Sequence, residues 1–218
     1  TDIIRRTSLP EPGITIDEIV AALDIPSPAK KGKLIIGSVG DISNSDHKMT
    51  QFSDSLIIST NYNDAGLLHL IDHIEKIAFN FLKMGFLCRG GIASGFLFHE
   101  ENVVFGPAMI EAYQLESSEA ICPRIILSKE VETYTSSMTG GERTVIERKL
   151  YRYPDFYAVH VLRQLAFVLD LPGEDNTWEM TYLAIKRHLA TEIARLVGEP
   201  KKREKVVSFM NYFNESRV

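Results

Sequence analysis

Alternating and continuous runs of apolar residues divide the middle of the chain into short strands and one long amphipathic helix. HKMTQFSDSLIIS (47–59) predicts a β-hairpin, with KMTQF and LIIS as its strands and Ser53-Asp54 at or near the turn. NYND (61–64) predicts the start of an amphipathic helix over roughly 65–84, which Gly85 ends. Elements that follow one another this closely favour a sheet packed against a helix.

The segment from 86 to 128 continues this alternation. FLCRGGIAS and GFLFH each predict a strand, HEEN predicts a turn and VVFG the start of another strand. Residues 107–120 predict a helix with Pro107 in its first turn, and PRIILS (123–128) predicts a further strand. The order strand, helix, strand, strand, helix, strand indicates a mixed α/β sheet domain.

The two ends of the chain have a different character. TIDEIVAALD (15–24) has the spacing of a capping box followed by a helical pattern, and KLIIGSV (33–39) fits a strand or a short helix. The pattern predicts a polar loop at TYTSSMTGGERT (133–144). It predicts strongly amphipathic helices at residues 178–197 and 201–214.

These patterns divide the chain into two parts. We expect residues 1–130 to form the sheet domain and residues 131–218 to form a helical C-terminal extension packed on it.

Composition narrows the class of protein. The 218 residues carry a formal net charge of −5, which argues against a general nucleic-acid binder. Cys88 and Cys122 form no CxxC pair and suit a reducing cytoplasm. The sequence shows no signal peptide, and no run of about 18 apolar residues predicts a membrane span. We therefore expect a cytoplasmic protein with no membrane partner.

Four motifs in order resemble the catalytic domain of class III nucleotidyl cyclases. They are FSDSLIIS (52–59), RGGIASG (89–95), FGPAMIEAYQLESS (105–118) and PRIILS (123–128). FSDS, RGGI, the GPAMIEAYQLES segment and NYFN (211–214) are most similar to the bacterial pyrimidine (uridylate or cytidylate) cyclases of anti-phage defence. The resemblance implies an α/β (α+β) fold with a ferredoxin-like βαββαβ core and added C-terminal helices.

The resemblance also implies metal chemistry at Asp54. Cyclisation of a nucleoside triphosphate uses two Mg²⁺ or Mn²⁺ ions, which carboxylates and phosphate oxygens hold. The second carboxylate has alternative positions. Asp2, in TDIIRRTSL, has the family's spacing; the other favoured position is a residue upstream of the chain as given. Asp41 is less favoured, because only twelve residues separate it from Asp54 and a helical crossover needs about that many by itself.

Three arginines are candidates for contact with the nucleotide. Arg5 and Arg6 would assist backbone N–H groups in binding the β- and γ-phosphates, or they are solvated surface charges. Arg89 either reaches the base or phosphates or pairs with a carboxylate near the sheet edge.

Several positions depart from the purine cyclases. Thr50 and Val103 occupy the positions that read the base, and a hydroxyl with an apolar side chain cannot form the adenine-reading pair. Ile110 and Gln114 replace the Asn and Arg that orient the ribose and stabilise phosphate charge. The departures fit a pyrimidine cyclase or an inactive cyclase fold.

The implied reaction converts UTP or CTP to the 3′,5′-cyclic monophosphate and pyrophosphate. In this family the site forms between two domains arranged head to tail, so a homodimer is implied, with a separate effector that responds to the product. The alternatives are a nucleotide-binding sensor without activity, a dimerisation module, and a relative of the diguanylate cyclases.

Histidines offer a second kind of site. His69 and His73 stand four residues apart on the predicted helix, which suits a metal, but the sequence supplies no nearby third ligand. We therefore interpret them as surface or interface histidines, and His99, Glu100 and Glu101 as turn residues.

Overall fold

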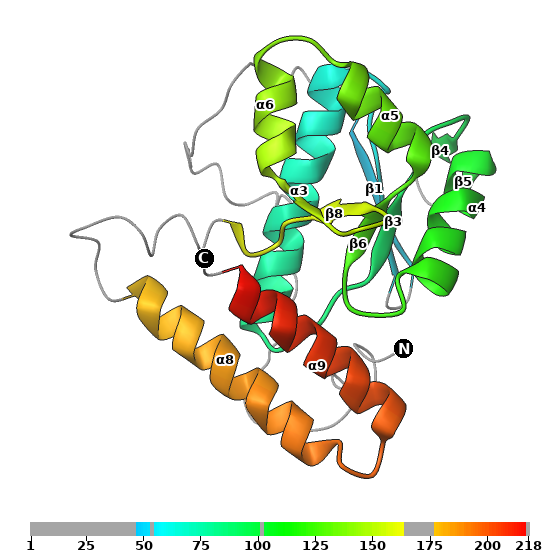
Figure 1. The fold of residues 1–218 in the computed structure, drawn as a ribbon. Coiled ribbons are helices and arrows are strands. Elements are labelled where there is room, and N and C mark those ends of the chain that lie inside the picture. Colours follow the sequence, from blue (N-terminus) through cyan, green and yellow to red (C-terminus); the bar gives the residue numbers. More distant parts are fainter. Residues whose placement is uncertain (1–46, 53–54, 101–102, 164–176, 217–218) are drawn as a thin grey trace, which may run out of the picture.

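A central four-stranded sheet organises the computed structural model, which describes residues 47–52, 55–100, 103–163 and 177–216 (Figure 1). Its strand order is β3-β6-β8-β7. The mixed α/β character expected from the sequence is confirmed.

The strands of this sheet run in both directions. β3 (Gly90–Ile92) pairs in parallel with β6 (Ile125–Leu127), because the chain crosses over between them. β8 (Tyr157–Val159) pairs antiparallel with β6 and with β7 (Leu150–Arg152).

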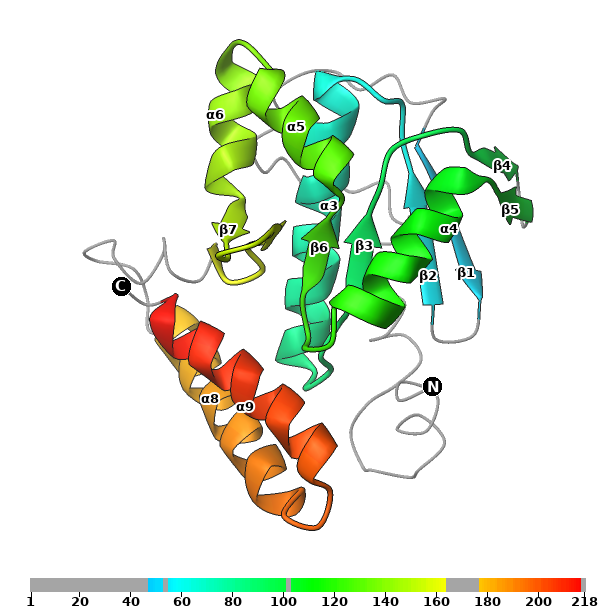
Figure 2. The same ribbon diagram turned by 45° about the vertical axis from the view of Figure 1, so that its right-hand side comes forward.

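Two separate hairpins lie beside the central sheet (Figure 2). β1 (Lys48–Phe52) and β2 (Ser55–Ser59) form the first, and its register opposes Phe52 to Ser55. β4 (Phe98–Glu100) and β5 (Val103–Phe105) form the second. Both hairpins follow the strand pattern of the sequence.

Helix α3 (Asp64–Lys83) is the long helix that the sequence predicts. The Asn63 side chain caps it by accepting a hydrogen bond from the Gly66 N–H at 2.8 Å. Gly85 ends it with φ of 84°, a conformation that favours glycine, and its carbonyl oxygen is 3.1 Å from Nε2 of His188.

The central sheet is covered on both faces. Ile125 and Leu127 pack in the same core as residues of α3, whereas Ile126 packs with Leu115 on the other face, as strand alternation requires. That second face is covered by α4 (Pro107–Gln114) and a π-helical turn, η1 (Leu115–Glu119) (Figure 2).

Gly91, the second glycine of RGGI, lies where the backbone leaves no room for a side chain. A Cβ atom at Gly91 would lie 2.4 Å from the Ala112 carbonyl oxygen and 2.6 Å from Cβ of Leu115. The first glycine, Gly90, pairs with Ile125. The absence of a side chain at Gly91 therefore lets α4 and η1 approach β3 closely.

The segment expected to be a polar loop is mostly helical, and only residues 138–140 lie outside a helix. It lies in α5 (Lys129–Ser137) and α6 (Gly141–Arg148). The Ser128 hydroxyl caps α5 by accepting a hydrogen bond from the Val131 N–H at 3.3 Å, so the hydroxyl-rich sequence does not prevent helix formation.

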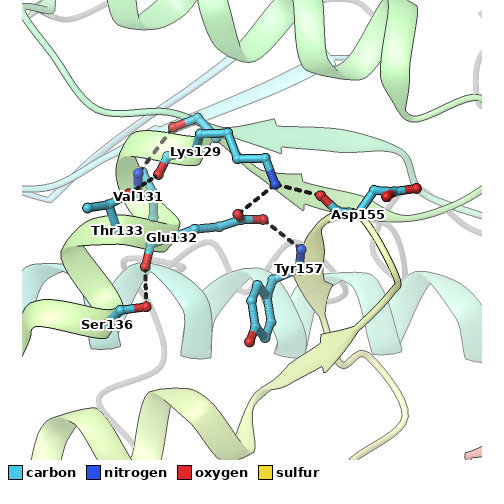
Figure 3. A network of polar contacts seen from close by, with 8 residues as sticks. Lys129, Val131, Glu132, Thr133, Ser136, Asp155 and Tyr157 are labelled. Atoms are coloured by element: carbon cyan, nitrogen blue, oxygen red, sulfur yellow. Dashed lines mark hydrogen bonds and ion pairs between the residues drawn. The ribbon is translucent and has the colours of Figure 1, made fainter.

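The expected C-terminal extension (131–218) contains two strands besides its helices, because β7 and β8 lie there and extend the central sheet. Glu132 of α5 holds this region in place. Its Oε1 accepts a hydrogen bond from the Tyr157 N–H at 2.7 Å, and its Oε2 lies 2.9 Å from Nζ of Lys129 (Figure 3). Lys129 also donates to the Asp155 carbonyl oxygen at 2.5 Å.

Helices α8 (Thr177–Arg195) and α9 (Pro200–Glu215) form an antiparallel pair at one end of the molecule (Figures 1 and 2). The ring of Tyr182 stacks on that of Phe213, with centroids 4.8 Å apart. Phe209 and Tyr212 join the main core. Both predicted amphipathic helices are thus confirmed, and their apolar faces pack on each other and on the sheet. The expected elements at 15–24 and 33–39 lie outside the described residues.

Candidate functional site

The hairpin β1–β2 is the element to which the sequence assigns the metal carboxylate. Its register opposes Phe52 to Ser55, so residues 53 and 54 connect the two strands. Asp54 itself lies outside the described residues, as do Asp2, Arg5, Arg6 and Asp41. The expected hairpin is therefore confirmed, while the ligand roles of these aspartates stay predictions.

Thr50 lies inside the molecule and contacts the second hairpin. Its side chain is 4% exposed, and its Oγ1 lies 2.8 Å from Nε2 of His99. Nδ1 of the same ring lies 2.8 Å from Oγ of Ser59, across the hairpin from β1. Both ring nitrogens of His99 therefore have hydroxyl partners, and the two hairpins are joined at this ring.

The surroundings of His99 disfavour its protonated form. Burial lowers its pKa, and the nearby Lys48 lowers it further. A neutral imidazole has one nitrogen that donates a hydrogen bond and one that accepts. A hydroxyl group can pair with either nitrogen, because it can both donate and accept.

The turn interpretation of His99 and Glu100 is wrong. Both residues belong to β4, and His99 is buried because it faces β1 and β2. Glu100 lies at the end of β4, where its Oε1 is 2.5 Å from Nζ of Lys48. The alternation of Phe98, His99 and Glu100 is the sequence signal for an inward-pointing histidine.

Val103 lies opposite Glu100 in the second hairpin and is 54% exposed. The structure thus places Thr50 and Val103, the two expected base-reading positions, on hairpins that contact each other. Of the two, only Val103 has an exposed side chain. The Thr50 hydroxyl is held by His99.

Arg89 precedes β3 and forms an ion pair with Glu116 of η1. Both side chains are partly exposed. A carboxylate partner near the sheet edge is one of the two roles expected for Arg89. Contact with a nucleotide, the other role, stays a prediction.

The positions that depart from the family pattern on α4 lie at the surface. Ile110 is 59% exposed, and Gln114 is exposed one turn further along. No cationic side chain stands at either position.

Exposed apolar side chains occur on α4 and around the second hairpin, and we refer to them together as the apolar surface. We define it by six exposed side chains: Phe96, Phe98, Val103, Phe105, Ile110 and Tyr113. The rings of Phe98 and Phe105 stack with centroids 4.9 Å apart. Exposed aromatic residues gathered on adjacent elements are typical of a surface that another protein covers.

The structure brings together three histidines that the sequence analysis did not connect. His47, which precedes β1, lies against His69 and His73 of α3, and one potential ligand atom from each histidine lies within 4.8 Å of the other two. Burial lowers the pKa of His47 to about 4, and the nearby His73 and His69 add to this effect. The spacing of His69 and His73 was visible in the sequence. The third histidine was not, because His47 lies 22 positions before His69 in the chain.

One cavity lies between α3, β8 and α9, and its lining includes Leu82, Tyr153 and Tyr212. Its volume of about 20 Å³ holds a water molecule but no nucleotide. This cavity is therefore not a candidate for substrate binding.

Comparisons with protein-family models, with curated proteins and with solved structures find no significant match to this chain. Among the described residues, no helix combines the length and the apolar character needed to cross a membrane.

Proposed function

We propose that this chain is the catalytic domain of a metal-dependent nucleotide cyclase that acts on a pyrimidine nucleoside triphosphate. The observation that carries the proposal is the order of elements around the four resembling motifs. A hairpin connected through Asp54 is followed by α3, by β3 with its RGGI glycines, by a second hairpin, and by α4 leading to a strand parallel to β3. This order of elements along the chain supports a cyclase-type core, while the first hairpin and β3 belong to separate sheets.

In the proposed cyclisation, one bond to the α-phosphorus forms and one breaks. The ribose 3′-oxygen forms a bond to the α-phosphorus and loses its proton, the bond from that phosphorus to the bridging oxygen breaks, and pyrophosphate leaves. Bound Mg²⁺ or Mn²⁺ would lower the pKa of the attacking hydroxyl and neutralise the triphosphate. Asp54 would hold the metal together with Asp2 or an upstream carboxylate. A carboxylate between two paired strands is compatible with this role, since Mg²⁺ is held by one or two carboxylates together with phosphate oxygens.

The preference for a pyrimidine rests on Thr50 and Val103. An adenine-reading site needs a donor and an acceptor at these positions, whereas Val103 is apolar and the Thr50 hydroxyl already contacts His99. UTP and CTP are the proposed substrates, and the cyclic product would act in the cytoplasm on a separate effector in anti-phage defence.

A head-to-tail homodimer is part of the proposal. The apolar surface on α4 and the second hairpin would be covered by a second copy of the chain. Association of two copies would also let one chain complete the site of the other. Arg5 and Arg89 are the candidate phosphate contacts; for Arg89 this requires that its ion pair with Glu116 opens.

A second candidate function is a nucleotide sensor without activity. The exposed Ile110 and Gln114 favour it, because a catalytic domain would place a cation and an amide there to stabilise developing charge.

The test is a product assay with the full-length protein, Mn²⁺ and each of the four nucleoside triphosphates. We expect cyclic UMP or cyclic CMP, which Asp54→Asn abolishes. Asp155→Asn is the matched control, because its exposed carboxylate lies on the loop between β7 and β8 and only its backbone oxygen contacts Lys129. Cyclic AMP would overturn the substrate assignment. Absence of product together with metal-dependent nucleotide binding would favour the sensor.

A further inference from the structure

Three histidines, one directly before β1 and two on α3, lie close enough together to share one ion. We propose that His47, His69 and His73 bind a divalent transition metal ion, with Zn²⁺ as the reference case. This site is separate from the Mg²⁺ or Mn²⁺ site proposed for Asp54, and the inference does not depend on the proposed function.

The ring nitrogens of the three histidines are almost close enough together to bind one metal ion. Nδ1 of His73 lies 3.0 Å from Nε2 of His47, and one potential ligand atom from each of the three rings lies within 4.8 Å of the others. Ring centroids are 4.7 Å apart for His47 and His69 and 4.9 Å apart for His47 and His73. Zinc–nitrogen bonds of about 2.0–2.1 Å in a tetrahedron separate the ligand nitrogens by roughly 3.4 Å. Small rotations of the side chains are enough to reach that distance.

The backbone holds two of the ligands rigidly. His69 and His73 lie in the first half of α3, four residues apart, so both side chains emerge from the same face of the helix. His47 is fixed by the strand that follows it, since Lys48 begins β1 and pairs with Ser59. A metal at this position would therefore connect a strand to a helix.

The polar groups of His47 are incompletely satisfied among the described residues. Its Nε2 faces His73, but its Nδ1 is buried and has no hydrogen-bond partner there. An orphaned buried nitrogen is costly, and a second imidazole at hydrogen-bond distance offers only one donor or acceptor. Coordination would use one ring nitrogen of each histidine and would replace the hydrogen bond between His47 and His73.

The donor set selects the class of metal. Neutral imidazole nitrogens suit Zn²⁺, Cu²⁺, Ni²⁺ and Fe²⁺, whereas Mg²⁺ and Ca²⁺ prefer oxygen ligands. Three protein ligands leave a fourth position for water or another ligand. The three side chains are only partly buried, so an ion can reach them from solvent.

The position of the site suggests its consequence. β1 begins directly after His47 and continues for five residues to Phe52, a length of about 16 Å. An ion bound to His47 would tie the start of β1 to α3 and would stabilise the hairpin against the helix. The expected role is to order the hairpin, not to take part in a reaction.

The experiment is a Zn²⁺ titration of the untagged, metal-free full-length protein, followed by calorimetry and thermal unfolding. We expect one Zn²⁺ per chain and a rise in Tm of about 5–10 °C at a hundredfold excess over Kd. Mg²⁺ should produce no such shift. Co²⁺ bound in place of Zn²⁺ should give the visible absorption of a tetrahedral or five-coordinate site.

Single substitutions identify the ligands. His69→Gln and His73→Gln should each weaken Zn²⁺ binding by more than about 100-fold, beyond the loss that outer-shell changes cause. His188→Gln is the control, because His188 lies on α8 and contacts Gly85; this variant should keep the full Zn²⁺-induced shift. Unchanged circular dichroism of His69→Gln would establish that it folds. Absence of stoichiometric binding, or binding that survives both substitutions, would overturn the proposal.

Discussion

Nζ of Lys149 lies 2.7 Å from Oε2 of Glu75, a carboxylate with no exposed surface in the middle of α3. Lys149 itself is buried, and its second partner is Asp72, at 2.6 Å, whose side chain reaches solvent. Burial raises the pKa of Glu75, and the ion pair with Lys149 opposes that effect. Burial alone would lower the pKa of Lys149. The carboxylates of Asp72 and Glu75 have a larger effect in the opposite direction, so the pKa of Lys149 is raised. The pair therefore joins α3 to the end of α6.

Lys149→Met should be one of the most destabilising single changes in the described part of the chain. It leaves Glu75 buried without its counter-ion, which typically costs about 3–5 kcal/mol. Urea unfolding measures the loss. The double variant Lys149→Met with Glu75→Leu should recover much of it, since no buried charge is then left unpaired.

Lys129→Met is the matched control for that change. Lys129 also pairs with a glutamate, but its side chain is 75% exposed, and such pairs contribute about 0–1 kcal/mol. Equal losses for Lys129→Met and Lys149→Met would contradict the role assigned to burial.

Thr50→Val should destabilise the contact between the two hairpins. The change is close to isosteric, but it leaves Nε2 of the buried His99 without its hydroxyl partner, at a cost of about 1–3 kcal/mol. Thr133→Val offers the comparison, because Thr133 is exposed and its hydroxyl donates to Lys129 within its own helix. That variant should stay within about 0.5 kcal/mol of the parent in chemical denaturation. A Thr50 variant as stable as the Thr133 variant would mean that the His99 contact contributes little.

The stability of the fold should fall with acidification before most carboxylates titrate. Burial lowers the pKa of His160 from 6.5 to about 4, and its Nδ1 lies 2.7 Å from Oη of Tyr212. Between these two values the unfolded chain binds a proton that the folded chain does not. Unfolding therefore becomes easier as pH falls from 6.5, by up to about 1.4 kcal/mol per pH unit from this residue.

Urea unfolding at several pH values from 7 to 5 checks this expectation. His160→Gln should show a flatter dependence than the parent, because the substituted position no longer titrates. Parallel pH curves for the two proteins would refute the assignment to His160.

Phe105→Glu should prevent self-association. Phe105 is 55% exposed and stacks on Phe98 within the apolar surface, where a second copy of the chain would have to desolvate the new carboxylate. Loss of a central aromatic contact costs about 2 kcal/mol or more, a weakening of roughly 30-fold. Sedimentation velocity over a concentration series measures the change. Val197→Glu, 75% exposed beyond the end of α8, should leave association unchanged. A parent protein that remains monomeric at high concentration would remove the dimer from the proposal.

Local sequence patterns predicted the parts of the fold whose signals are local. The hairpin at 47–59, α3, α8 and α9 each have enough residues for period-2 or period-3.6 alternation to be visible. β7 and β8 have three residues each, too few for an alternating pattern to be visible. β8 is a strand because it pairs with β6, and β7 because it pairs with β8. The hydroxyl-rich α5 did not show a helical pattern because Ser and Thr compete for backbone hydrogen bonds. The cap at Ser128 and the burial of Val131 and Thr135 outweigh this preference.

The candidate sites divide in the same way. Sequence alone determined that a carboxylate connects the strands of the first hairpin and that two histidines share one face of α3, because both facts follow from spacing along a single element. Only the tertiary structure decided that His47 joins those histidines, that His99 is a buried link between Thr50 and Ser59, and that Lys149 reaches Glu75. Each of these contacts depends on how distant segments pack, and side chains carry no local signal of the partner that packing will bring to them.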